Sequence, residues 1–276
     1  MLDVPRGAGF GLYISTDGTN RPTTTTGVAV TPSTTSMASA TVAPMGSALP
    51  EDAHAIEVRI SNTGADSASR EIATEIMVSY DGGSSWLTLI PGLLCGGTMS
   101  YAAGARIYDF PIFIAAGALL GARAYGSVTT ALRVMAITAH RPLHQELRRA
   151  GHIVEAVGLS GRVGTTIVPG DTSEGARTLI GTTTVPLWHW QMGLQLVAGD
   201  TSWVNAVMHF DVEYGDGTNF HQILLDVPWV TNSGEALFSW PRTNELHLPA
   251  GSAVYARGQT SGTLDSYTAV VYGVGG

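Results

Sequence analysis

The chain contains no lysine, and all 14 of its basic residues are arginine. Charged residues make up only 13% of its 276 residues, about half of the roughly 25% found in ordinary soluble domains. The formal net charge is −8, and neither half of the chain is basic. This charge distribution argues against a nucleic-acid-binding protein, which needs a basic surface to neutralise phosphates. A chain with so few charges is expected to bury part of its surface in an assembly.

Cysteine is nearly absent, since Cys95 is the only one. An intrachain disulfide and a cysteine-based metal cluster are therefore excluded. The first residues lack a basic segment followed by an apolar one, so no signal peptide is predicted. The most apolar run, FPIFIAAGALLGARA at 110–124, is too short to span a bilayer and is interrupted by Pro and Gly. We expect a protein made in the cytoplasm, with no membrane insertion and no export by the usual route.

Motifs for catalysis are also missing. The sequence has no phosphate-binding loop, no dinucleotide fingerprint, no G-x-S-x-G and no H-E-x-x-H. Asp211 and Glu213 share a strand face by their spacing, but almost any sheet protein offers such a pair of carboxylates. We therefore expect a protein that is not an enzyme, with no catalytic residues, no metal site and no cofactor.

The sequence contains an internal duplication. A shift of 134 residues places Tyr80 on Tyr214 and Arg123 on Arg257, and no gap is needed from about residue 53 to residue 125. Identity between the copies is low, but turn residues and apolar positions coincide. The duplication predicts two similar domains, at 1–139 and 161–276.

Each copy is typical of a series of short strands. WHWQMGLQL at 188–196 alternates apolar and polar residues, as a strand with one buried face does. Between the copies, at 140–160, Pro142 and Gly151 suit the start and the end of one short helix. The predicted fold class is all-β: two tandem duplicated antiparallel β-sandwich domains, jelly-roll-like, joined by a short helical linker.

The stretch SYDGGSSW at 79–86 has the S-x-D-x-G-x-x-W spacing of the Asp-box found in sialidases. Its second copy, EYGDGTNF at 213–220, keeps the Gly-containing turn and the aromatic residue but moves the Asp by one place. An Asp-Gly sequence between two strands is a strong hairpin signal. We therefore interpret both stretches as hairpin turns, formed by Asp81, Gly83 and Trp86 in the first copy and by Asp216, Gly217 and Phe220 in the second.

Four residues are candidate contacts to a partner or a glycan: Trp229, Trp240, Arg123 and Arg257. Both tryptophans lie in a long connection of the second copy. A tryptophan in such a connection can be an assembly anchor, a platform for sugar stacking or an ordinary packing residue, and the sequence leaves these three alternatives open. Both arginines follow an Ala-Gly turn, on strands expected to present them.

The segments FPIFIAAGALLGARA and LHLPAGSAVYARG, each before the final strand of its copy, resemble small β-sandwich virion proteins of tailed bacteriophages and phage-like particles. The resemblance covers most of both copies and supplies no catalytic residues. It implies a structural subunit on the head (as a spike or fibre) or the tail, made in the host cytoplasm and located in the virion. Such a subunit would form a homo-oligomer, trimer or higher, and contact other virion proteins. The alternatives are a module that binds a host glycan or receptor and, less favoured, a glycoside-processing enzyme.

Overall fold

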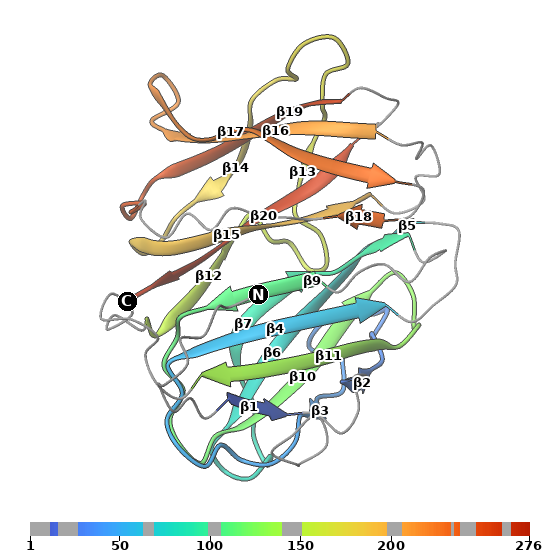
Figure 1. Cartoon of the computed structure of the whole chain (residues 1–276), viewed down its shortest axis with the longest axis vertical. Coiled ribbons are helices and arrows are strands. Elements are labelled where there is room, and N and C mark those ends of the chain that lie inside the picture. The colour runs from blue at the N-terminus through green and yellow to red at the C-terminus, as the bar shows by residue number, and fades with distance from the viewer. Residues whose placement is uncertain are drawn as a thin grey trace.

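The computed structural model of the chain consists of two β-sandwiches, one above the other in Figure 1. The structure describes residues 12–15, 27–62, 69–98, 106–139, 151–197, 206–232, 235–237, 247–260 and 266–276. All regular elements in these ranges are strands, which confirms the all-β class. No helix of the described residues is long and apolar enough to cross a membrane.

Sandwich one consists of two antiparallel sheets. The first has the order β1-β11-β4-β9, with β2 also on β11, and its strands are β1 (Leu12–Ser15), β2 (Val28–Val30), β4 (Ala55–Asn62), β9 (Arg106–Phe110) and β11 (Leu132–Ala139). The second has the order β3-β10-β6-β7, and its strands are β3 (Ala43–Pro44), β6 (Ile72–Ser79), β7 (Leu87–Leu94) and β10 (Leu119–Gly126). A small separate pair is formed by β5 (Ser69–Arg70) and β8 (Gly97–Thr98).

Sandwich two repeats this arrangement. Its first sheet has the order β12-β20-β13, with β15 also on β20, and its strands are β12 (Ile153–Val157), β13 (Thr165–Ile167), β15 (Leu187–Leu196) and β20 (Tyr267–Gly275). Its second sheet has the order β14-β19-β16-β17-β18, and its strands are β14 (Thr178–Thr182), β16 (Ala206–Gly215), β17 (Phe220–Asn232), β18 (Glu235–Leu237) and β19 (Ala253–Thr260).

The path of the chain is that of a jelly roll. In sandwich one it changes sheet after β2, β3, β4, β7, β9 and β10, so each sheet collects strands that are distant in the sequence. Strands β13 to β20 follow the same course, and a bridge between Leu248 and Leu187 adds the segment before β19 to the first sheet. Both sandwiches therefore have the expected jelly-roll topology. The duplication is visible in the strands, since β10 and β19 have equal lengths and begin 134 residues apart.

The helical linker expected at 140–160 is not supported. Residues 140–150, where the helix was predicted, lie outside the described residues. Residues 153–157 form β12, which pairs with β20 and belongs to the first sheet of sandwich two. The second half of the predicted linker is thus a strand. IVEAV forms one because valine and isoleucine fit a sheet and because β20 offers an edge for pairing.

Strand β20 belongs to two hydrophobic cores. All nine of its residues are buried, whereas its counterpart β11 buries only alternate residues. Because successive strand residues point to opposite faces, β20 packs inward on its own sandwich and outward on sandwich one. The inward residues are Tyr267, Ala269 and Val271, and the outward residues are Val270, Tyr272 and Val274.

The side chain of Tyr272 anchors this contact between the sandwiches. It is fully buried, and its ring lies edge-on to Tyr108 of sandwich one at 5.5 Å. Its hydroxyl accepts a hydrogen bond from the Leu94 amide at 2.8 Å and donates one to the Gly92 carbonyl at 2.8 Å. Tyr272 therefore satisfies two backbone groups of β7 that would otherwise be buried without a partner.

Gln195 on β15 makes a second polar contact across the same junction. Its Oε1 atom accepts hydrogen bonds from the amides of Ile72 at 3.2 Å and Gly96 at 3.1 Å, while its Nε2 atom donates to the Arg162 carbonyl at 2.7 Å. The Arg162 side chain in turn reaches Glu71 of sandwich one, with its Nε atom 3.4 Å from Oε2. Apolar packing and side-chain-to-backbone bonds together hold the two sandwiches in one relative position.

Candidate functional site

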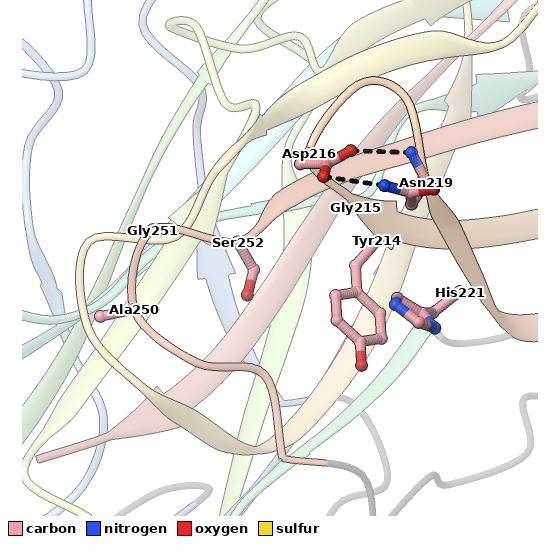
Figure 2. Close-up of a pocket in the computed structure, with 8 residues that line it drawn as sticks. All are labelled: Tyr214, Gly215, Asp216, Asn219, His221, Ala250, Gly251 and Ser252. Atoms are coloured by element: carbon pink, nitrogen blue, oxygen red, sulfur yellow. Dashed lines mark hydrogen bonds between the residues drawn. The ribbon is translucent and has the colours of Figure 1, made fainter.

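An open pocket lies at one end of sandwich two. The turn between β16 and β17 forms one wall, and the loop that leads into β19 forms the other (Figure 2). Its volume is about 270 Å³. The pocket is lined by Tyr214, Gly215, Asp216, Asn219, His221, Ala250, Gly251 and Ser252. The Asp-Gly turn and the Ala-Gly turn, which the sequence singled out separately, thus meet at one place.

Two rings dominate this pocket. Tyr214 on β16 and His221 on β17 are directly opposite each other in the antiparallel register. Their rings are stacked, with centroids 5.1 Å apart and planes 29° apart. Figure 2 shows the two side chains next to each other. Cross-strand aromatic pairs stabilise each other's orientation. The sequence alone did not identify this pair, although its signal is simple: two rings that flank an Asp-Gly turn.

Asp216 organises the turn beside the rings. Its Oδ1 atom accepts hydrogen bonds from the amides of Thr218 at 2.8 Å and Asn219 at 2.7 Å, and its Oδ2 atom accepts one from Asn219 Nδ2 at 3.2 Å. The Asn219 amide, the Thr218 amide and the Asn219 side chain lower the pKa of this carboxyl to about 2. Gly217, at a φ of 90°, adopts a conformation that other residues rarely take.

Because the Asp216 pKa is lowered in the folded state, its stabilising effect is present above its ordinary value of 3.8 and is lost as pH falls to about 2. We expect Asp216→Asn to be less stable than the parent at neutral pH and to lose less stability over this acid range. Thermal unfolding of both proteins at several pH values measures how the stability of each one depends on pH. Parallel curves would show that the ionised carboxylate does not contribute.

The corresponding turn of sandwich one has the same design. The Asp81 carboxylate accepts hydrogen bonds from the Ser85 amide at 2.9 Å, from the Ser85 hydroxyl at 2.5 Å and from the Ser79 hydroxyl at 2.7 Å. These bonds, with Ser85 contributing most, hold the pKa of Asp81 well below its usual range. Gly83, at a φ of 92°, donates its amide to the Ser79 hydroxyl at 2.8 Å. Both carboxylates are engaged in closing a turn between paired strands.

The aromatic residue that follows each turn packs against the sheet. A Cβ atom placed on Gly121 would lie 2.7 Å from the Trp86 ring, so this ring rests directly on the backbone of β10. In sandwich two, Phe220 meets the edge of the Tyr255 ring at 5.1 Å, and the Arg177 guanidinium lies 4.5 Å above the Phe220 ring.

The gap-free alignment of the two copies requires a correction at this hairpin. It placed Tyr80 on Tyr214, but the sheet register places Val78 there, because Val78 pairs with Leu87 as Tyr214 pairs with His221. The connection from β6 to β7 is therefore two residues longer than the connection from β16 to β17. An offset of two residues leaves every side chain on the same face of its strand.

The corrected register reveals an arginine–carboxylate pair that both copies share. Arg123 is opposite Glu75, and its Nε atom lies 2.7 Å from Glu75 Oε2. Arg257 is opposite Asp211, and its Nη2 atom lies 3.1 Å from Asp211 Oδ2. Both arginines were predicted as partner or glycan contacts. The structure places each of them in an ion pair on the outer face of its own sheet, and their role as contacts stays a prediction.

Arg257 is the centre of a larger charged cluster, which we call the Arg257 cluster. Besides Asp211, its guanidinium contacts Glu174 and Glu213. Asp211 and Glu213 are almost fully buried, with side chains 2% and 4% exposed. Burial, followed by a hydrogen bond with Asp211, raises the pKa of Glu174.

Oxygen atoms of Glu174, Asp211 and Asp226 lie within 4.8 Å of one another, as the ligands of a cation would. The Arg257 guanidinium already supplies a positive charge to this group. The amide of Asp226 also donates to Asp211 Oδ1 at 2.7 Å. The arrangement sets three carboxyl groups against the single guanidinium of Arg257.

The structure describes little of the two tryptophans that were predicted as contacts. Trp229 belongs to β17, opposite Met208, but its side chain is not among the described ones. Trp240 lies outside the described residues. Their role as partner or glycan contacts stays a prediction.

No protein-family model and no curated protein matches the chain. Solved structures that are similar include PNGase F, a glycosylasparaginase from Flavobacterium meningosepticum, at 8% identity and a TM-score of 0.33, covering 90% of this chain and 96% of that chain. The tandem CBM22 domains of Xyn10C from Paenibacillus barcinonensis match at 11% identity and a TM-score of 0.25, covering 97% and 91%. Naturally occurring empty particles of cowpea mosaic virus match at 9% identity and a TM-score of 0.30, covering 82% and 77%. Similarity at this level says nothing about function.

Proposed function

We propose that the chain is a non-enzymatic structural subunit of a phage or phage-like virion, which assembles as a symmetric homo-oligomer on the head or the tail. The observation that supports this most is the junction of the two jelly rolls through β20, which makes one body with a buried, hydrogen-bonded seam. A building block of a particle has to keep its shape while its outer surfaces make contacts. Jelly rolls occur in viral capsid proteins as well as in lectins, and this part of the proposal is an analogy of fold.

The low content of charge supports the same proposal. Several large apolar side chains of the described residues are exposed, among them Leu179, which is 48% exposed on β14. Strand β14 is the last strand at one edge of its sheet in the described part of the chain. The Thr165 hydroxyl donates to the Ile180 carbonyl of this strand at 2.9 Å, and an edge strand with an exposed apolar side chain is a template for pairing with another chain unless it is covered. An oligomer would cover it.

We expect the purified protein to be a trimer or a larger oligomer by light scattering, and Leu179→Glu to shift it toward the monomer. Tyr80→Glu is the matched control, because Tyr80 is 57% exposed but lies in the turn between β6 and β7 and not on an edge strand. A map of purified particles should contain the chain at a symmetric position. A protein that is monomeric at micromolar concentration and absent from particles would refute the proposal.

A further inference from the structure

The duplication provides an internal comparison for the pocket of sandwich two. Tyr214 and His221 occupy the positions of Val78 and Leu87 in sandwich one, according to the strand registers. Ser252 occupies the position of Ala118, one residue past the Ala-Gly turn. The fold is the same in both sandwiches, so it requires neither the two rings nor the hydroxyl. The three residues that differ lie around one cavity. They give it two aromatic rings and a hydroxyl group, which are side chains that can contact a ligand.

The two rings offer a rigid apolar face. Tyr214 is half-buried against the core of sandwich two, while His221 is exposed and stacked on it. A ring held by a neighbour loses little conformational freedom when a ligand packs on it, and aromatic side chains supply a large contact area at low entropic cost. Figure 2 shows the Tyr214 ring and the Ser252 side chain projecting toward the same side. The Ser252 hydroxyl donates to the Pro249 carbonyl at 2.8 Å, which leaves its oxygen able to accept.

Asp216 determines the charge that the pocket accepts. Its carboxylate receives three hydrogen bonds from the turn, out of roughly four lone-pair positions. It can therefore accept one further bond from a ligand hydroxyl, and bonds of this charge-assisted kind are strong. No arginine is among the described residues that line the pocket. An anionic ligand would be repelled by the Asp216 carboxylate, which has no arginine beside it among these lining residues.

The cavity of about 270 Å³ is slightly smaller than the roughly 300–1,000 Å³ typical of sites for drug-sized ligands. It has room for one ring. A ligand that combines an apolar ring face with several hydroxyl groups matches the stacked rings, the Ser252 oxygen and the Asp216 carboxylate together. We propose that this pocket binds a single uncharged sugar ring. The proposal does not depend on the virion role and adds a recognition site to it.

The test uses the full chain and ligand-observed NMR with a panel of probes. The neutral probes are the methyl pyranosides of galactose, glucose, mannose and fucose together with N-acetylglucosamine, and the acidic probes are glucuronic acid and N-acetylneuraminic acid. We expect at least one neutral probe to bind with a Kd on the order of 1 mM, and the acidic probes to bind more weakly.

The variants are chosen from the duplication. Tyr214→Val combined with His221→Leu installs the residues of sandwich one, which that sandwich accommodates in the same fold. We expect this double variant to lose about tenfold or more in affinity. His221→Leu alone changes an exposed side chain, so it tests the site even if the double variant fails to fold. Tyr80→Val is the control, because Tyr80 is a 57% exposed tyrosine beside the equivalent turn, and it should bind as the parent does.

Three results would overturn the proposal: no neutral probe binds at millimolar concentration, the double variant binds as the parent does, or acidic probes bind as tightly as neutral ones. Particle association is measured separately on the same double variant. Loss of sugar binding with normal assembly would support both proposals. Sugar binding by a chain that never assembles would leave the recognition site established and the virion role refuted.

Discussion

Replacing Tyr272 with alanine is expected to lower the free energy of unfolding by about 5 kcal/mol. Truncating a fully buried aromatic ring costs about 3–5 kcal/mol because it leaves a cavity. The change also leaves the Leu94 amide and the Gly92 carbonyl without the partner that Tyr272 provides. Both losses fall on the seam between the sandwiches. Calorimetry should therefore show two unfolding transitions in the variant where the parent shows one.

The matched control for this prediction is Ile137→Ala. Ile137 occupies on β11 the position that Tyr272 occupies on β20, but it is only half-buried. Its truncation should cost about 1–2 kcal/mol and leave a single transition. Tyr272→Phe keeps the ring and removes only the hydroxyl, so its expected cost is about 1–3 kcal/mol. Equal costs for the alanine variants at 137 and 272 would contradict the idea that β20 joins the two cores.

The second large effect is expected for Arg257→Met, which should destabilise the protein by about 3–5 kcal/mol. The substitution leaves the Asp211 carboxylate buried without its cation, while Glu213 keeps its ion pair with Arg177. Removing one partner of a buried ion pair is far more costly than the pair's net contribution, because the remaining charge has already lost its water. Urea unfolding at neutral pH measures this difference.

Arg123→Met is the control for Arg257→Met, because Arg123 is the equivalent residue of sandwich one and, among the described residues, forms an ion pair with Glu75 alone. The Glu75 side chain is 15% exposed, so water can compensate part of the loss, and we expect a cost of about 1–2 kcal/mol. Adding Asp211→Asn to Arg257→Met should recover part of the lost stability. A larger effect at Arg123 than at Arg257 would contradict this account of the Arg257 cluster.

The fold was accessible from the sequence because its signals are local. Alternation such as that of residues 188–196 predicts a strand with one buried face, and the Asp-Gly and Ala-Gly turns separate the strands. The two-residue offset at the first hairpin could not be seen in the sequence. Side chains lie on the same face of the strand whether Val78 or Tyr80 is aligned with Tyr214. The hydrophobic pattern is identical in both cases, and the register is revealed by strand pairs such as Val78 with Leu87 and Arg123 with Glu75.

The candidate pocket could not be predicted either, because the register between strands is not visible in the sequence. Tyr214 and His221 meet only when the register of β16 on β17 is known, and Ser252 joins them through the packing of a distant loop. The second half of the linker was misinterpreted, because IVEAV is too short to show a clear period. A five-residue strand becomes recognisable only through its partner, β20.

The position of β20 in the chain also has a consequence for biosynthesis. Sandwich one has all its described strands once residue 139 has been made, but the covering for its β7 edge is completed only when residues 270–274 emerge. At about 5–20 residues per second, this interval lasts on the order of ten seconds. During that time the nascent first jelly roll presents an uncovered apolar edge to neighbouring chains on the same messenger. The distance in the sequence between β7 and β20 thus sets how long each new chain is exposed to premature association.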